Sequence, residues 1–348
     1  MQIESHGQAP LLSIQNITTE FVRGGGLPFA RRSRVHAVSD VSFEIRAGES
    51  LGIVGETGCG KSTLAKTLVG IHTPVSGKVL YRGVDLAAKR LKGGAELRRE
   101  IQFVFQDSYS ALDPRWTVER LVAEPLKISG GVKRGEVRER VASLLERVGL
   151  DPEQYMSRRP RALSGGQRQR VAVARALSLN PSVLICDEVV SGLDVSIQAQ
   201  LLNMFEQLRQ ELDLTFVFIS HDLNVVRYFC DRVGVMYLGH LVEIGPVQDL
   251  YGSAAHPYMA ALLSAVPGTS GNSDRIRLTG DLPSPLDPPS GCRFRTRCPF
   301  ASERCAAEVP ALRDLGNGHR VACHYPLVAG RSGNKSETVR QVAGERRG

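Results

Sequence analysis

A glycine-rich segment at residues 55–63 has the residue types that suit a bound chain of phosphates. Glycines let successive backbone N–H groups turn inward around phosphate oxygens, and a helix that begins there adds positive potential. Lys61 can reach the β- and γ-phosphates of a nucleotide, and the Ser62 hydroxyl can bind magnesium. We therefore predict a nucleotide site in this phosphate loop, whose residues are Gly55, Glu56, Thr57, Gly58, Cys59, Gly60, Lys61, Ser62 and Thr63.

Two carboxylates end the apolar segment SVLICDE at residues 182–188. In a strand, Asp187 and Glu188 would lie at the carboxyl edge of the sheet, where α/β proteins bind ligands. We predict that Asp187 holds the magnesium ion, which leaves Glu188 free to orient and polarise a water molecule. Strands often end in acidic residues, so this pattern alone is weak evidence. It is informative here because it accompanies a phosphate loop.

A second anion-binding helix start is predicted at residues 163–167, with the sequence LSGGQ. Ser164 and the two glycines after it precede a helical pattern, so backbone N–H groups are free there. One nucleotide does not need two such helix starts from one chain, so the second is best used by a neighbouring chain. A phosphotransferase kinase built on the same loop would have no use for this segment.

The elements that must position these residues alternate between strands and helices. An apolar strand (50–55) leads into the phosphate loop and a helical stretch follows, as the loop chemistry requires. The alternation predicts an α/β fold with a mostly parallel sheet that is covered on both faces. Strands are predicted at 11–22, 38–46, 77–84, 101–105, 182–188 and 215–221, helices at about 117–162, 166–179 and 196–212, a loop at 23–34 and a hairpin around 238–240.

Composition and charge agree with a globular protein. Apolar residues make up 42% and charged residues 23% of 348, and the apolar runs are far shorter than a membrane helix needs. No secretory signal is recognisable in the first thirty residues, so we expect a soluble intracellular protein. Of the net charge of +8, residues 271–348 supply +5, from 13 basic and 8 acidic residues. Nucleic-acid binders carry their excess charge on the folded domain, so we expect no nucleic acid partner.

The motif LSGGQRQR (163–170), between the loop and the carboxylates, resembles the signature of ATP-binding cassette (ABC) proteins. Three further segments resemble family motifs in family order over about 11–250: the glutamine loop at Gln106, the loop at 191–194 and the switch histidine His221. The resemblance implies catalytic roles for Glu188, His221 and Gln106, with magnesium held by Ser62, Gln106 and Asp187. It also implies that ATP on a partner cassette meets Ser164, Gly165, Gly166, Gln167 and Asp194.

One aromatic side chain is a candidate for stacking on adenine, as the resemblance implies. Phe21 ends the first predicted strand, Phe29 in the following loop is its rival, and an ordinary apolar strand residue is the alternative interpretation of Phe21. The sequence departs from the family pattern at Val189, where proline is usual, and at Gly192, where alanine is common. Glu188 is present, so we expect a site that is competent for hydrolysis.

The segments 105–118, 256–267, 278–305 and 321–326 resemble the ATPase subunits of dipeptide and oligopeptide importers, most closely the second ATPase of the pair. This implies an ATPase at the cytoplasmic face of the membrane, with two integral permeases, an extracytoplasmic substrate-binding protein and a second ABC ATPase subunit. A heterodimer is expected because such systems use two different ATPases. Nickel or glutathione remain open as substrates, as does a soluble ABC ATPase acting on nucleic acid or ribosomes.

The expected organisation is an ATP-binding domain at 11–266, a C-terminal extension at 267–330 and a disordered tail at 331–348. The first contains an antiparallel β subdomain near its N-terminus and a helical subdomain at about 107–163. We expect the integral subunits to dock on the helical subdomain beside Gln106.

Four cysteines crowd into the extension, at positions Cys292, Cys298, Cys305 and Cys323. In a reducing compartment such crowding points to metal before disulfides, but the spacing fits neither zinc knuckles nor the usual ferredoxin patterns. The resemblance to importer ATPases implies that these cysteines bind a 4Fe–4S cluster, and zinc, unligated thiols or disulfides are the alternatives. Arginines that could offset the negative charge of a cluster are Arg293, Arg295, Arg297 and Arg304.

Overall fold

In the described part of the chain, the centre of the molecule is an eight-stranded sheet in the order β11-β12-β10-β9-β3-β8-β7-β6. A computed structural model describes residues 9–23, 33–89, 99–130, 132–133, 135–266, 276 and 278–327. Five neighbouring strands run parallel, and three of them, β3, β7 and β8, are buried at every residue, as a sheet covered on both faces requires. The parallel strands are β9 (Arg232–Tyr237), β3 (Ser50–Val54), β8 (Thr215–Ile219), β7 (Val183–Asp187) and β6 (Ile101–Val104).

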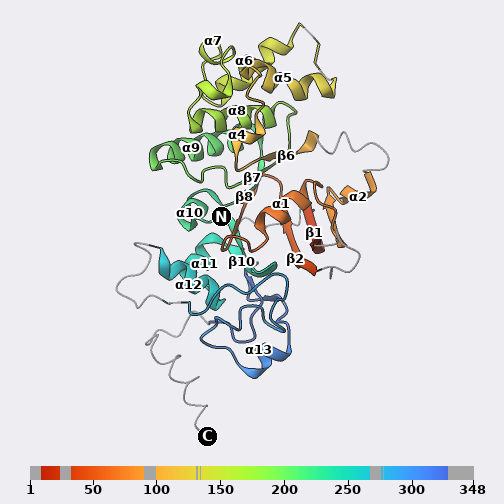
Figure 1. Cartoon of the computed structure of the whole chain (residues 1–348), viewed down its shortest axis with the longest axis vertical. Helices are drawn as coiled ribbons and strands as arrows, with labels where there is room; N and C mark the ends of the chain where they lie inside the picture. Colours follow the sequence, from red (N-terminus) through yellow and green to blue (C-terminus); the bar gives the residue numbers. More distant parts are fainter. Residues whose placement is uncertain are drawn as a thin grey trace, which may run out of the picture.

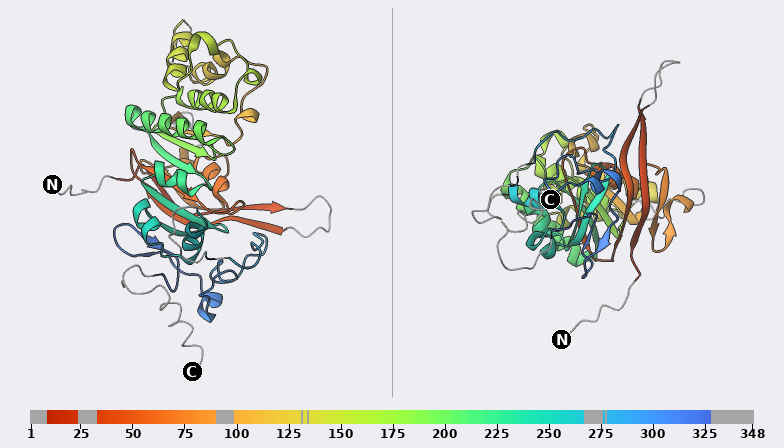
Figure 2. Two further views of the ribbon diagram at one scale, coloured as in Figure 1. Left: turned by 90° about the vertical axis from the view of Figure 1, so that its left-hand side faces the viewer. Right: turned by 90° about the horizontal axis from the view of Figure 1, so that it is seen from below.

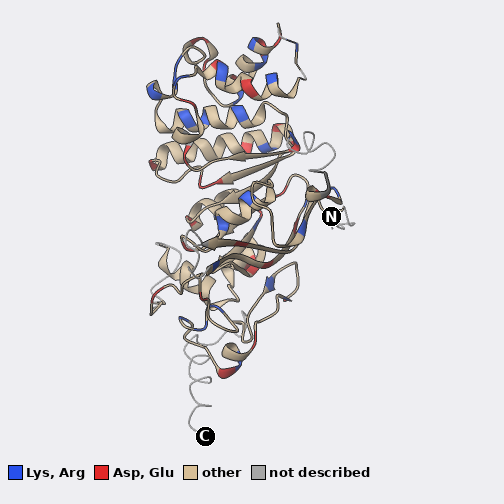
Figure 3. Ribbon diagram, turned by 45° about the vertical axis from the view of Figure 1, so that its right-hand side comes forward, with Lys and Arg blue, Asp and Glu red and all other residues tan. Residues whose placement is uncertain are grey.

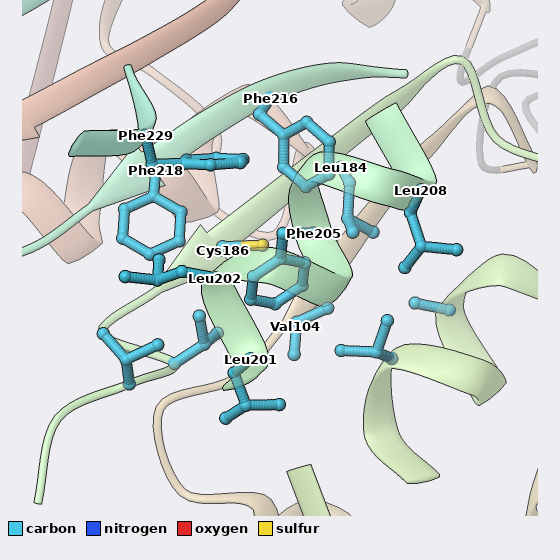
Figure 4. Close-up of a cluster of buried hydrophobic side chains, with 14 of the residues drawn as sticks. Val104, Leu184, Cys186, Leu201, Leu202, Phe205, Leu208, Phe216, Phe218 and Phe229 are labelled. Atoms are coloured by element: carbon cyan, nitrogen blue, oxygen red, sulfur yellow. The ribbon is translucent and has the colours of Figure 1, made fainter. Parts of the chain in front are cut away.

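Side chains of β8 alternate between two cores, because successive residues of a strand point to opposite faces. Phe216 and Phe218 belong to one core, and Val217 and Ile219 belong to the other. In the first core, Phe205 lies with ring centroids 5.8 Å from Phe216 and 6.2 Å from Phe218 (Figure 4). The helices beside the sheet are α1 (Lys61–Leu68), α8 (Gly165–Leu177), α9 (Val195–Leu212) and α10 (Leu223–Phe229).

A separate antiparallel sheet has the order β2-β1-β4-β5 and stands to one side of the molecule (Figure 2). The expected antiparallel subdomain is therefore present. Its second strand begins at Ser33, five positions before the predicted start at 38, and the predicted strand 77–84 is two strands separated by a turn at 82–83. Residues 24–32 of the predicted loop, with Phe29, lie outside the described residues. The strands are β1 (Leu12–Arg23), β2 (Ser33–Ile45), β4 (Ser76–Tyr81) and β5 (Val84–Asp85), and a short helix α2 (Leu86–Lys89) follows.

A group of short helices forms the upper end of the molecule in Figure 1. They occupy the stretch in which the sequence pattern predicts a helical subdomain, and their apolar sides join the core that contains α8. Leu121 and Val122 of α5 and Val141 and Leu145 of α6 are fully or almost fully buried there. The elements are α4 (Ser108–Ala111), α5 (Val118–Ser129), α6 (Val137–Arg147), α7 (Pro152–Tyr155) and a 3-10 turn (Pro160–Ala162).

The chain beyond the hairpin of β9 and β10 returns to the main sheet. β12 pairs antiparallel with β10, with Val321 opposite Glu243, so the C-terminal segment extends the sheet at the end opposite β6. Phe294 is 1% exposed and packs its ring against Tyr237 and Tyr258, at centroid distances of 5.1 and 5.4 Å. The elements are β10 (His240–Pro246), α11 (Val247–Gly252), α12 (Pro257–Ala265), α13 (Glu303–Ala307), β11 (Arg313–Asp314) and β12 (Arg320–Val321).

Two further features concern the chain as a whole. Figure 3 shows Lys and Arg residues interspersed with Asp and Glu residues along the helices and strands. Among the described helices, none combines the length and the apolar character needed to cross a membrane. The predicted disordered tail at 331–348 lies outside the part of the chain that the structure describes.

Candidate active site

The phosphate loop joins the end of β3 to the start of α1 and needs glycine at two positions. A Cβ on Gly55 would lie 2.2 Å from the carbonyl oxygen of Met236, and a Cβ on Gly60 would lie 2.1 Å from that of Ala37. Both residues also have positive φ, 149° and 107°. Gly58 has a φ of 82° and nothing within 4 Å of its would-be Cβ. The loop is thus packed tightly on its core side and open at Gly58, as a cradle for phosphates must be.

Lys61 and Ser62 are the first two residues of α1, directly after the phosphate loop. The Lys61 side chain donates hydrogen bonds to the carbonyl oxygens of Gly55 and Glu56, at 2.7 and 3.0 Å. The Ser62 hydroxyl donates to Asp187 Oδ1 at 3.0 Å. Two predicted magnesium ligands from distant parts of the chain therefore touch. A hydroxyl and a carboxylate are oxygen ligands of the kind that Mg²⁺ prefers, so these residues fit the ion.

Asp187 is buried beneath the loop, with 4% of its surface exposed. Burial raises the pKa of this carboxyl above its usual value, and the hydrogen bond from Ser62 acts in the opposite direction. The neighbouring Glu188 carboxylate raises the pKa of Asp187 further, because two like charges lie close together. A cation at this place would offset both the cost of burying the Asp187 charge and its repulsion by Glu188. This is a second sign that Asp187 is suited to be a ligand of magnesium.

Three predicted catalytic residues converge at the ends of adjacent strands. Glu188 Oε2 accepts a hydrogen bond from Gln106 Nε2 at 2.8 Å and lies 3.6 Å from His221 Nδ1. Gln106, Glu188 and His221 follow β6, β7 and β8, whose order in the sheet brings their carboxyl ends together. The hydroxyl of Ser191 also lies 3.5 Å from Glu188 Oε2. The side chain of Gln106 is predicted from the sequence to bind magnesium. Here its amide nitrogen donates a hydrogen bond to Glu188.

The backbone of Glu188 is held in an unusual conformation. Its φ is 50°, in the left-handed region that non-glycine residues rarely adopt, and its N–H donates to the carbonyl of Ile219 at 3.0 Å. Such conformations cost free energy and occur most often at functional sites. The strained backbone thus lies at the residue whose carboxylate meets Gln106, His221 and Ser191.

The helix start at 164–167 is built as a capping box. The Ser164 hydroxyl accepts from the N–H of Gln167 at 3.3 Å, and the Gln167 side chain accepts from the N–H of Ser164 at 3.0 Å. A Cβ on Gly166 would lie 2.5 Å from Ile197 on α9, so close helix packing requires glycine there. Asp194 caps α9 by accepting from the N–H of Ile197 at 3.0 Å. Ser164 and Asp194 are both exposed.

Two other residues named for the nucleotide site have simple surroundings. Phe21 lies near the C-terminal end of β1 and is 37% exposed. Its ring meets the ring of His72 edge to face, at a centroid distance of 5.0 Å. Cys59, within the phosphate loop, is 1% exposed, and burial raises the pKa of its thiol. A buried thiol with a raised pKa is a poor nucleophile.

The four cysteines of the C-terminal segment line one small cavity, together with Phe294 and His256. Burial, together with the smaller effect of the neighbouring thiols, raises the pKa of Cys298 to about 12 and that of Cys323 to about 11. All four are free thiols. Within the described ranges, no three or more His, Cys, Asp or Glu side chains are arranged to hold a single metal ion.

The arginines among these cysteines are bonded to other groups. Arg293 donates to the Ser39 hydroxyl at 3.0 Å, Arg295 to the carbonyl of Ser290 at 2.9 Å and Arg304 to Glu308 at 2.9 Å. Arg297 donates to the carboxylate of Glu56 in the phosphate loop. Burial raises the pKa of Cys292, and the charge of Arg295 acts weakly in the opposite direction.

A hollow of about 290 Å³ lies away from this site and is not part of it. Arg82, Arg140 and Arg147 line it together with Ser182 and Thr215, which stand at the amino ends of β7 and β8. The phosphate loop follows the carboxyl end of β3, which is parallel to β8. The hollow is therefore at the opposite edge of the sheet from the predicted catalytic residues.

Sequence reasoning missed the residues that hold Glu56. Its N–H donates to the Tyr258 hydroxyl at 2.9 Å, and its carboxylate accepts from Arg297 Nη1 at 2.8 and 3.0 Å. No spacing rule connects positions 241 residues apart. One feature of the sequence could have indicated such a partner. Glu56 is an acidic residue inside a loop that binds anions, and a negative charge there needs a positive partner.

Comparisons with known proteins agree with this geometry. Residues 38–191 match the ABC transporter family, and residues 242–305 match the C-terminal region of oligopeptide/dipeptide transporters. The chain is 46% identical to the oligopeptide transport ATP-binding protein AppF of Bacillus subtilis, over 91% of this chain and 98% of that protein. It is 47% identical to the di/tripeptide transport ATP-binding protein DppF of Pseudomonas aeruginosa, over 90% and 97%.

The fold is also similar to solved structures. One of them is described as the dimeric structure of a post-hydrolysis state of an ATP-binding cassette bound to ADP and Pi. It superimposes with a TM-score of 0.60 and 29% sequence identity, covering 68% of this chain and 98% of that chain.

Proposed function

The chain belongs to the family of ABC transporter ATPases, and from this premise we propose that it is the ATP-hydrolysing subunit of an importer of dipeptides and oligopeptides. The observation that carries the ATPase role is the meeting of Gln106, Glu188 and His221 beside the Ser62–Asp187 pair, at the edge of the sheet where the phosphate loop opens. The peptide substrate is supported by the C-terminal match at 242–305 and by the names of the relatives.

In the proposed site, the phosphate loop and the start of α1 bind the phosphates of ATP. The Lys61 ammonium turns from the carbonyls of Gly55 and Glu56 toward the β- and γ-phosphates, which are stronger acceptors because they are charged. Ser62, Asp187 and Gln106 hold the magnesium ion, which neutralises part of the phosphate charge. Phe21 stacks on adenine, for which its partly exposed ring at the end of β1 is suited.

Glu188 is proposed to orient and polarise the water that attacks the γ-phosphate. Its carboxylate is already held by Gln106 at 2.8 Å and approached by His221 at 3.6 Å, so it has little freedom to turn away. His221 is proposed to contact the γ-phosphate as well. Positioning of this kind is the main contribution that a protein makes to phosphoryl transfer.

A second ATPase is proposed to complete each nucleotide site. Ser164, Gly165, Gly166, Gln167 and Asp194 would face the ATP that is bound to the phosphate loop of the partner. Exposure of Ser164 and Asp194 at the starts of two helices supports this arrangement, because exposed N-termini attract phosphates. The dimeric cassette structure, which resembles this chain, supports it too. We propose a heterodimer with a related ATPase.

The chain is proposed to act at the cytoplasmic face of the membrane, bound to two integral permeases that receive substrate from an extracytoplasmic binding protein. The permeases dock on the helical subdomain at about 107–163, beside Gln106, within an ATP-binding domain at 11–266. Phe105 and Tyr109, which flank Gln106, are 41% and 49% exposed and offer an apolar surface for this contact.

The extension at 267–330 is proposed to bind a 4Fe–4S cluster through Cys292, Cys298, Cys305 and Cys323. All four thiols line one cavity, which supports a shared ligand. Each cysteine of such a cluster binds a different iron atom, so the sulfurs stand farther apart than four sulfurs around one zinc ion. Among the described residues no three such side chains surround a single ion, which agrees with a cluster better than with zinc.

The proposed substrate is tested by uptake into membrane vesicles that contain the assembled transporter and its binding protein. We expect ATP to drive the uptake of labelled dipeptides and oligopeptides. Uptake of nickel or glutathione in place of peptides would contradict the peptide assignment while leaving the ATPase role intact.

A further inference from the structure

The C-terminal segment reaches the phosphate loop through a partly buried ion pair between Arg297 and Glu56. Arg297, next to Cys298, places Nη1 at 2.8 Å from Glu56 Oε2 and at 3.0 Å from Oε1. The two side chains are only 11% and 27% exposed, so water screens the pair weakly. This contact joins the segment that carries the cysteines to the second residue of the loop.

Glu56 is held at every polar group that it has. Its N–H donates to the Tyr258 hydroxyl at 2.9 Å, its carbonyl accepts from Lys61 at 3.0 Å, and its carboxylate accepts from Arg297. Tyr258 is itself fixed by edge-on packing against Tyr237, at a centroid distance of 4.8 Å. A residue restrained in this way fixes the path of the loop on either side of it.

The same segment supports the loop from a second direction. Arg293 donates hydrogen bonds to the carbonyl of Leu238 and to the Ser39 hydroxyl. Gly239, which follows Leu238 in the turn between β9 and β10, donates to the carbonyl of Cys59 at 2.8 Å. Segment 293–297 therefore contacts the loop directly at Glu56 and through one intermediate turn at Cys59.

The charges of Arg297 and Glu56 connect this contact to the binding of phosphates. Glu56 is the acidic residue of the phosphate loop, and an unpaired carboxylate there would repel the phosphates that the loop binds. Arg297 neutralises this charge and at the same time fixes its position. A lysine at 297 would keep the charge, whereas a glutamine would leave Glu56 unpaired.

We propose that Arg297 is a positioning residue for the nucleotide: it neutralises and orients Glu56, so that the C-terminal segment sets the affinity of the phosphate loop for MgATP. This inference rests on the proposed function, since it assumes that the loop binds ATP. It assigns to residues 293–297 an effect on the nucleotide site that does not depend on what the cysteines bind.

The test is the affinity of the full chain for MgATP, measured by calorimetry. Arg297→Gln is expected to weaken binding about tenfold, which corresponds to about 1.4 kcal/mol. Arg297→Lys should retain most of the affinity. The double variant Glu56→Gln with Arg297→Gln should recover to within about threefold of the wild type, because the unpaired charge is gone. Arg304→Gln, which breaks an exposed pair in the same segment, is the matched control and should bind normally.

A kinetic measurement separates positioning from loss of fold. In the assembled transporter, Arg297→Gln should raise KM for ATP by about the same factor and leave kcat nearly unchanged, because Gln106, Glu188 and His221 are untouched. A misfolded protein would lose both, and the second substitution would not restore binding.

The outcomes separate a failure of this inference from a failure of the proposed function. Normal MgATP affinity in Arg297→Gln, or a double variant that binds no better than the single one, overturns this inference alone. A wild-type chain that does not bind MgATP overturns the proposed function, and this inference falls with it.

Discussion

At the scale of single residues, the site depends on contacts between positions that are distant in the chain. Order and residue type along the sequence are sufficient to place Lys61, Ser62, Asp187, Glu188 and His221 at one edge of the sheet, because each lies at or shortly after the end of a strand there. Partners could not be predicted in the same way. The hydrogen bond from Gln106 to Glu188 and the positive φ of Glu188 arise from the order of the strands and from a tight strand end, which no local pattern encodes.

The pair formed by Ser62 and Asp187 leads to a prediction about magnesium. Replacing Asp187 by Asn keeps the shape but removes the charge that faces the ion, so the affinity for Mg²⁺ in the presence of ATP should fall more than about tenfold. A magnesium titration of ATP binding measures this. Asp151→Asn is a suitable control, because Asn caps a helix as well as Asp does and residue 151 caps α7. An unchanged magnesium requirement in Asp187→Asn would contradict the assigned ligand.

At the scale of elements, the apolar pattern of the sequence predicts strands and helices well where they are completely buried. β3, β7 and β8 are buried on both faces and appear in the sequence as continuous apolar runs, and α9 starts and ends within one residue of its predicted bounds. The edges were predicted less well. β2 continues outward to Ser33 because it pairs with β1 as far as Arg23, and this pairing holds residues whose own pattern indicates a loop.

The helical subdomain is proposed to transmit closure of the nucleotide site to the permeases, which leads to a prediction of uncoupling. Tyr109→Ala, together with Phe105→Ala, removes the exposed apolar side chains beside Gln106, so peptide uptake should fall several-fold while MgATP affinity stays within about twofold. Uptake and nucleotide binding are measured on the same preparation. Val84→Ala, which trims a partly exposed apolar residue on β5, is the control. Normal uptake after substitution of this whole face would rule out docking here.

At the scale of the whole molecule, the C-terminal segment is part of the structure that contains the nucleotide site. β12 joins the main sheet, and the fully buried Glu243 accepts from the N–H groups of Ala255 and His256 and bonds to His319 at 2.8 Å. None of this follows from the sequence pattern, because β11 and β12 have two residues each and the pairing of β12 with β10 is long-range. The sequence predicts an extension at 267–330 with four crowded cysteines, but no strand of the main sheet within it.

The proposed cluster gives a prediction that does not depend on activity. Protein purified without oxygen should be brown and contain about four iron atoms per chain. Cys298→Ser should lower the iron content and the melting temperature, whereas Cys230→Ser, at a buried thiol beneath the main sheet, should leave the iron content unchanged. Colourless, iron-free protein that still folds and hydrolyses ATP would contradict the cluster, and bound zinc would favour the zinc alternative.

The central claim is that Glu188 polarises the attacking water in a site that drives transport, and one measurement tests it most directly. ATP turnover and peptide uptake are compared in vesicles that carry the wild-type transporter or the Glu188→Gln variant, after MgATP binding to both has been confirmed. Glutamine keeps the shape and loses the charge, so we expect normal binding with turnover and uptake reduced at least about a thousandfold, by analogy with water-positioning residues of other nucleotide hydrolases. Normal turnover in Glu188→Gln would contradict the account.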